Sequence, residues 1–165
     1  MPTTPQAEHE WLARLAGEWT GEMECQMGPD QPPLKTTGTE TVQMLGGPWY
    51  IAEGKGEMPG GGEGLHRMII GFDPSSGRFV GNFVASGMTH MWIYNGTLDA
   101  SRKALTLETE GPGMSGEKLG KYRDTIEMIS DDHRTLTSEA LTEDGQWVQF
   151  MKADYRRVRQ AGDDQ

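Results

Sequence analysis

The side chains in this sequence that could carry out acid–base chemistry are two histidines, two tyrosines and an aspartate. His66 and His90 each fall in a segment that reads as a β-strand, and so do Tyr94, Tyr122 and Asp124. An imidazole titrates near neutral pH, so it can act as a general base beside a phenol or a carboxyl group. The alternative is that each histidine is isolated and has its own hydrogen bonds. Catalysis would require at least two of these groups within hydrogen-bond reach in one cavity.

The two histidines could also bind a metal ion or haem as a pair. The sequence has no His-Glu-x-x-His motif and no cluster of carboxylates at the spacing of metal ligands. Cys25 is its single cysteine, so neither a cysteine-based metal site nor an intrachain disulfide can form. The glycines between residues 60 and 64 lack the Lys-Ser/Thr pair of a phosphate-binding loop. We therefore expect no metal and no cofactor.

Methionines and tryptophans are candidates for lining an apolar pocket. The chain has 11 methionines and 5 tryptophans, many of them inside or beside predicted strands. Flexible thioether side chains suit a pocket for irregular apolar ligands, although they also fill ordinary cores. With the strand histidines and a tyrosine they give the candidate ligand-binding residues Met23, Trp49, His66, Met68, His90, Trp92, Tyr122 and Met151.

The element on which the positions of these groups depend is a strand at residues 19–27. Trp19, Met23 and Cys25 alternate there with Glu22 and Glu24. Period-two alternation of this length indicates a strand with one dry face and one wet face. Because a strand cannot bury an apolar row alone, the rest of the chain must supply the opposite wall.

Nine further segments read as strands, and most are joined by short turns rich in glycine, proline and aspartate. They are residues 36–45, 49–56, 66–72, 78–86, 89–98, 104–110, 121–130, 134–142 and 146–158. A short helix is expected at residues 8–15, and no convincing helix follows, which excludes βαβ folds. About ten strands predict one all-β domain at residues 8–159, as an up-and-down antiparallel barrel or a sandwich. Residues 1–7 and 160–165 read as a disordered arm and tail.

Length and charge limit the class of protein. A chain of 165 residues is most simply one domain. Its formal net charge of −10 opposes phosphate backbones and anionic membranes, so we expect no nucleic-acid partner and no membrane partner. The polar N-terminus and the lack of a long apolar run favour a cytoplasmic location.

Three short motifs occur in order along the chain. They are LAGEWTG at residues 15–21, NGTLD at residues 95–99 and ADYR at residues 153–156. In this order and spacing they resemble the bacterial family of unknown function DUF1579, within the calycin group of lipocalin-like barrels. The likeness spans nearly the whole chain, and it implies a lipocalin-like up-and-down barrel of about ten strands with a short N-terminal helix.

The resemblance also implies how the barrel is closed. In lipocalin-like proteins the tryptophan of a Gly-x-Trp motif plugs the closed end, under a basic side chain from late in the chain. Trp19 matches the tryptophan, and Arg156 or Arg157 matches the basic residue. An even-stranded meander brings its last strand antiparallel to its first, which would place these side chains together. Haem-binding members of the barrel group use a late histidine, and residues 134–165 contain none.

Three functions are compatible with such a barrel. The first is binding of a small, mainly apolar molecule inside it. The second is an enzyme that uses His66 or His90 as a general base. The third is a filled barrel that acts as a structural module or a homodimer, for which exposed Met91 and Ile93 would be the signal. We expect the first, with a small apolar ligand as the partner.

Overall fold

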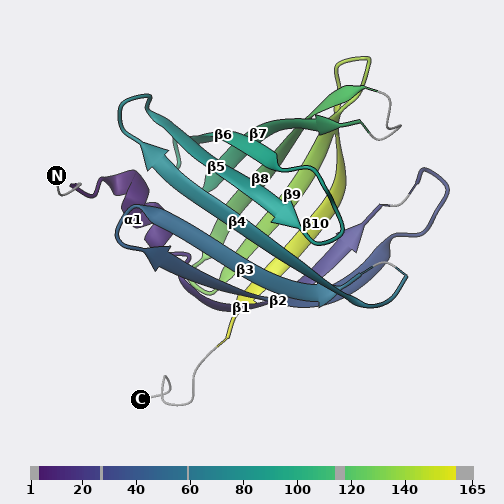
Figure 1. Ribbon diagram of the computed structural model, residues 1–165, viewed down its shortest axis with the longest axis horizontal. Helices are drawn as coiled ribbons and strands as arrows, with labels where there is room; N and C mark the ends of the chain where they lie inside the picture. Colours follow the sequence, from purple (N-terminus) through teal and green to yellow (C-terminus); the bar gives the residue numbers. More distant parts are fainter. Residues whose placement is uncertain (1–3, 27, 59, 114–117, 159–165) are drawn as a thin grey trace.

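Ten antiparallel strands form a closed barrel, and one short helix lies at one end of it (Figure 1). The elements are α1 (Ala7–Ala13), β1 (Gly17–Cys25), β2 (Leu34–Leu45), β3 (Trp49–Glu57), β4 (Glu63–Asp73), β5 (Arg78–Ala85), β6 (Trp92–Leu98), β7 (Ala104–Pro112), β8 (Leu119–Ser130), β9 (His133–Leu141) and β10 (Trp147–Arg157). The computed structural model describes residues 4–26, 28–58, 60–113 and 118–158. The predicted all-β up-and-down barrel with an N-terminal helix is confirmed, and the alternative of a sandwich is wrong.

Some predicted bounds differ from those observed. The strand expected at residues 89–98 begins only at Trp92, so His90 lies in the connection before β6 rather than on a strand. Residues 89–91 precede the β5–β6 pairing, which begins where Trp92 pairs with Phe83. The predicted end of the first strand at residue 27, part of the expected arm (residues 1–3) and the expected tail (residues 160–165) lie outside the described residues.

The barrel closes where its first strand meets its last. In the register of this pair Trp19 faces Arg157, Gly21 faces Tyr155 and Cys25 faces Met151. Gly21 is the close-approach point, because a β-carbon there would lie 2.7 Å from the Tyr155 ring. Closure pairs every strand on both sides, so no unpaired edge remains among the ten.

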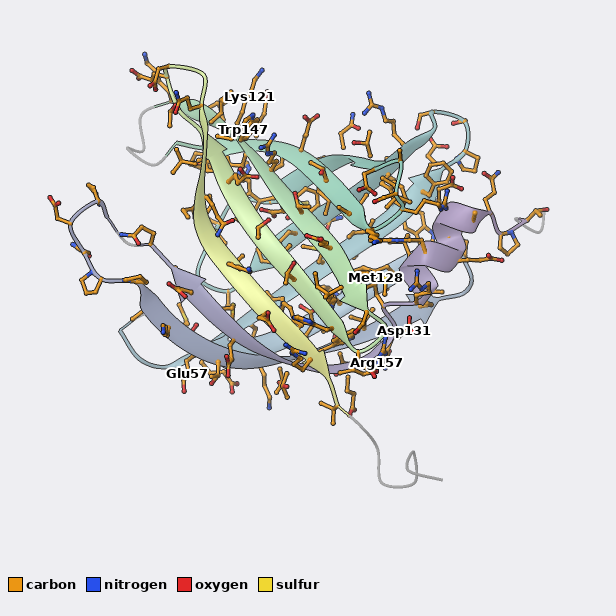
Figure 2. All side chains as sticks on the ribbon, turned by 180° about the vertical axis from the view of Figure 1, so that it is seen from behind. Glu57, Lys121, Met128, Asp131, Trp147 and Arg157 are labelled. Atoms are coloured by element: carbon orange, nitrogen blue, oxygen red, sulfur yellow. The ribbon has the colours of Figure 1, made fainter. Side chains whose placement is uncertain are left out.

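Helix α1 covers one end of the barrel. Its apolar edge, Trp11 and Leu12 with Leu15 just beyond, is fully buried, as the sequence predicts. The Trp11 indole N–H donates to the carbonyl of Arg102 at 2.7 Å, which ties the helix to the β6–β7 turn. Figure 2 shows Asp131 and Arg157 toward this end, and Lys121 and Trp147 at the opposite end. No helix among the described residues is long and apolar enough to cross a membrane.

Candidate ligand-binding cavity

A partly open cavity of about 650 Å³ lies inside the barrel. Seven strands, β4 to β10, contribute side chains to its wall, and its rim includes the connection before β6 and Gly113, which directly follows β7. Its apolar lining consists of Met68, Phe83, Met88, Trp92, Tyr122, Leu136, Phe150 and Met151. The helix end is filled by the core, so the cavity belongs to the half of the barrel away from α1.

Five of the eight predicted ligand-binding residues lie in this wall: Met68, His90, Trp92, Tyr122 and Met151. All except His90 come from strands, and they occupy the inward row of their strands. The sequence pattern could not assign the inward face of β4, β6 and β8, but the structure assigns it to the row of Met68, the row of Trp92 and the row of Tyr122.

Met23 and His66 point inward but do not line the cavity. The methyl group of Met23 lies 3.5 Å from the positions that β-carbons on Gly38 and Gly56 would occupy. The imidazole of His66 lies over Gly54, where a β-carbon would come within 2.3 Å of Cε1. These side chains therefore fill the space above the glycines of β2 and β3, which explains why those strands add nothing to the cavity wall.

Trp49 was predicted to line the pocket, and this prediction is wrong. Its side chain is 40% exposed, whereas its neighbour Tyr50 is buried. The indole lies on the outer face over Gly71, whose β-carbon would meet the ring at 2.3 Å. The segment that begins at Trp49 is apolar on both faces of its strand, so alternation could not indicate which residues point inward.

A row of aromatic rings crosses the rim of the cavity. The ring of His90 meets Trp92 edge-on at 4.7 Å between centroids, and Trp92 meets Tyr122 edge-on at 5.1 Å. Phe150 continues the row at 6.1 Å from Tyr122. The Tyr122 hydroxyl donates to the carbonyl of Pro112 at 2.6 Å, and so holds this ring against the rim.

A polar cluster centred on Asp124 interrupts the apolar wall. The hydroxyl of Tyr94 donates to Oδ2 of Asp124 at 2.5 Å, and the hydroxyl of Ser138 donates to Oδ1 at 2.6 Å. Burial raises the pKa of Asp124, and the two donated hydrogen bonds oppose that shift only in part. Burial also raises the pKa of Tyr94 strongly, so this phenol stays a hydrogen-bond donor.

A buried ion pair lies deeper in the barrel. The guanidinium of Arg134 donates to Oε1 of Glu40, and Nε2 of His66 lies 2.8 Å from Oε2 of the same carboxylate. Burial alone would raise the pKa of Glu40, but the hydrogen bond with His66 and the charge of Arg134 outweigh it and lower that pKa. The sequence analysis missed Glu40 and Arg134. The available signal was an acidic residue two positions from Val42 and a basic one two positions from Leu136, each in an inward row.

Trp19 lies at the closed end, as the resemblance implied. Its ring is 1% exposed and its indole N–H donates to the carbonyl of Leu15 at 2.9 Å. Of the two predicted basic residues, Arg157 lies over this ring, with 4.3 Å between the guanidinium carbon and the ring centroid, and Arg134 also lies over it at 4.7 Å. Arg156, the other candidate, is wrong, because its side chain is 66% exposed and pairs with Asp154 on the outer face. Alternation along β10 allows only one of two consecutive residues to point inward.

The two histidines do not form the arrangement that a general base requires. His66 binds Glu40, and Nε2 of His90 lies 3.1 Å from the carbonyl oxygen of Glu110. In the part of the chain that the structure describes, neither imidazole is hydrogen bonded to Tyr94, Tyr122 or Asp124. Within the same residues no group of three His, Cys, Asp or Glu side chains is arranged to hold a metal ion.

Comparison with known proteins gives one family. The model of the family described as "Protein of unknown function (DUF1579)" matches residues 4–157. No curated protein gives a significant match to this chain.

Solved structures give matches in fold. Rv2717c from M. tuberculosis is 14% identical and matches with a TM-score of 0.65, over 94% of this chain and 100% of that chain. The S-type phycobiliprotein lyase CPES from Guillardia theta is 12% identical and matches with a TM-score of 0.63, over 94% of this chain and 95% of that chain. At these identities the matches establish a shared barrel fold.

Proposed function

Because the chain belongs to the DUF1579 family, which is defined without a known activity, we propose a function from its interior: it binds a small, mainly apolar molecule inside the barrel. The observation that carries this proposal is the cavity of about 650 Å³. Sites for small molecules typically measure about 300–1,000 Å³ and are lined mainly by apolar and aromatic side chains. Both the size and the lining fit that class of site.

The nature of the wall favours a ligand over water as the occupant. A water molecule needs two to four polar partners, and outside the cluster of Asp124, Ser138 and Thr109 the wall is mainly apolar. Met68, Leu136 and Met151 instead present polarizable or aliphatic surface. Burial of such surface against an apolar ligand is favourable by roughly 25 cal/mol per Å².

The rim is suited to admit a ligand. It includes Gly87, Met88 and Thr89 before β6, and Pro112 at the end of β7 with Gly113 after it. Beside the aromatic row, these glycines and the flexible side chain of Met88 present less bulk than the rings, so we expect a ligand to enter on this side of the rim.

Titration with a neutral apolar fluorophore, N-phenyl-1-naphthylamine, tests the proposal. We expect enhanced, saturable fluorescence with the unmodified protein. Met151→Trp adds a bulky ring inside the cavity and should weaken binding at least tenfold. Val148→Trp on the same strand is the matched control, because Val148 is 50% exposed and does not line the cavity.

Two results would contradict the proposal. One is the absence of saturable binding by a protein that gives a normal melting curve. The other is an equal effect of the two tryptophan substitutions, which would place the probe elsewhere.

The other two functions have weaker support. A filled structural barrel accounts less well for a cavity of about 650 Å³. A histidine-based enzyme lacks the hydrogen bond from an imidazole to Tyr94, Tyr122 or Asp124 in the described residues. Binding therefore accounts for more of the geometry than either.

Self-association is compatible with ligand binding. Met91 is 52% exposed and Ile93 is 60% exposed, and Val80 on the neighbouring strand is 37% exposed. On a chain with a net charge of −10, this apolar patch, which borders Glu108, Glu110 and Lys121, is where two copies could bury apolar surface against each other. Light scattering would give twice the monomer mass for a dimer, and Ile93→Glu should return it to the monomer. A monomer at all protein concentrations would exclude this role.

A further inference from the structure

The cavity wall contains one buried carboxylate that lacks a counter-ion. Asp124 receives hydrogen bonds from Tyr94 and Ser138, both uncharged donors. No lysine, arginine or histidine of the described residues forms an ion pair with it. A carboxylate has about four lone-pair positions, so two donors leave about half of its accepting capacity unused. A buried ionised group without a partner is costly, and its cost falls when an opposite charge binds beside it.

Near Asp124 lies a polar atom that has no hydrogen-bond partner among the described residues. The hydroxyl oxygen of Thr109 is buried and makes no hydrogen bond with any described residue, although the side chain lines the cavity. Thr109 faces Tyr122 across the β7–β8 pair, and Leu107 faces Asp124. Thr109 and Asp124 are therefore diagonal neighbours on the inner face of two paired strands, a separation that a small polar group of a ligand can bridge.

We propose that the molecule bound in the cavity is an amphiphilic cation, an alkyl or aryl amine. Its ammonium group donates to the free positions of Asp124 and to the Thr109 hydroxyl, and its apolar body packs against Met68, Leu136 and Met151. This inference rests on the proposed function, since it names the chemical class of the ligand for the same cavity.

Two further features favour a cation. Trp92, Tyr122 and Phe150 form the aromatic row at the rim, and the faces of aromatic rings attract cations. The chain also has a net charge of −10, which raises the local concentration of cations and lowers that of anions. An alkyl carboxylate of the same length would be repelled both by the net negative charge of the protein and by the charge of Asp124.

Calorimetric titration at pH 7 with three probes of equal chain length separates these contributions. The probes are nonylamine, 1-nonanol and nonanoate, which differ only in the polar head group. We expect nonylamine to bind about 10- to 100-fold more tightly than 1-nonanol, the range for a hydrogen bond to a charged group. Nonanoate should bind more weakly than the alcohol.

Asp124→Asn should reduce the affinity for nonylamine to about that for 1-nonanol and leave the alcohol unchanged. The matched control is Glu108→Gln, because Glu108 lies on the exposed face of β7 and its loss changes the net charge equally. The control should leave the preference for the amine intact. An equal loss in both variants would assign the preference to net charge and overturn the role of Asp124.

Failure of this inference differs from failure of the proposed function. If 1-nonanol binds but nonylamine has no advantage, the cavity is a binding site and the cationic class is wrong. If none of the three probes binds to the folded protein, the proposed function itself is wrong.

Discussion

The guanidinium carbon of Arg157 lies 4.3 Å from the centre of the Trp19 ring, although Trp19 belongs to the first strand in the sequence and Arg157 to the last. The two are partners in the register that joins β1 to β10. Arg157 also donates to the carbonyls of Ala16 and Arg14, so one side chain joins the last strand to the segment between helix and first strand. The contact thus secures both barrel closure and the position of the helix that covers its end.

Trp19→Ala should lower the free energy of unfolding by about 3–5 kcal/mol, the usual cost of emptying a buried aromatic site. The variant would also lose the hydrogen bond to Leu15 and remove the ring that Arg134 and Arg157 both contact. Urea denaturation measures the change. Trp49→Ala is the control, since that ring is 40% exposed, and should cost roughly 1 kcal/mol. Equal costs for the two variants would contradict the structural role of Trp19.

Arg157→Ala and Arg156→Ala form a matched pair of neighbours on β10. The side chain of Arg157 is 22% exposed and donates to three backbone carbonyls, whereas that of Arg156 is 66% exposed. We expect a loss of about 1.5–3 kcal/mol for the first and a change within about 0.5 kcal/mol for the second. Thermal melting of both variants is sufficient. A larger effect at Arg156 would show that the inward row of β10 is assigned wrongly.

The architecture could be predicted from the sequence because local signals were consistent. The strand that begins at Trp19 alternates cleanly, the turns are marked by glycine and proline, and an even number of strands places the last beside the first. The apolar edge of α1 was predicted from the spacing of Trp11, Leu12 and Leu15. Each signal is local, and closure follows from their number and order.

The site was predicted only in part. Where the two faces of a strand are equally polar or equally apolar, the direction in which each side chain points is decided by the tertiary fold and not by the local sequence. Trp49 was placed inside since its strand begins with apolar residues on both faces. Glu40 was overlooked because β2 carries polar residues on both faces, so nothing local distinguishes an inward glutamate. Its partner Arg134 lies seven strands later in the chain, a pairing that only the closed barrel brings about.

Glu40→Gln should be strongly destabilising, by about 3–5 kcal/mol, because it leaves the buried Arg134 charge without its partner. The lowered pKa of Glu40 gives stability that is present above the unfolded pKa of about 4.3 and lost as pH falls through the folded value. The difference from the unmodified protein should therefore be largest at neutral pH and shrink below pH 4.

The double variant Glu40→Gln with Arg134→Met tests the cause. Removing both charges should recover part of the loss, since the penalty belongs to the unpaired arginine. The unfolding should be measured with urea, because guanidinium chloride is a salt and would screen the charges under test. If the double variant loses more free energy of unfolding than the two single variants lose together, the ion-pair explanation is refuted.

Asp124→Asn should stabilise the empty protein at pH 7, although it removes a proposed ligand contact. Burial raises the pKa of Asp124, so its ionisation at pH 7 is more costly in the folded state than in the unfolded state. The stability that this group contributes is present below the unfolded pKa of about 3.9 and is lost as pH rises through the folded value. The neutral asparagine avoids the loss, and each kcal/mol recovered would raise the melting temperature by about 2–4 °C in a domain of this size.

Asp99→Asn is the control of opposite sign. Asp99 lies in the β6–β7 turn, where hydrogen bonds from Ser101 and the backbone lower its pKa, so its charge stabilises the fold at neutral pH. Its replacement should lower the melting temperature at pH 7. Melting curves from pH 7 down to pH 4 should show the advantage of Asp124→Asn diminishing as the pH approaches the unfolded pKa of about 3.9. If Asp124→Asn is destabilised at pH 7, the two hydrogen bonds of Asp124 outweigh the cost of burying its charge. The proposal that Asp124 binds a cationic ligand would then lose its energetic basis.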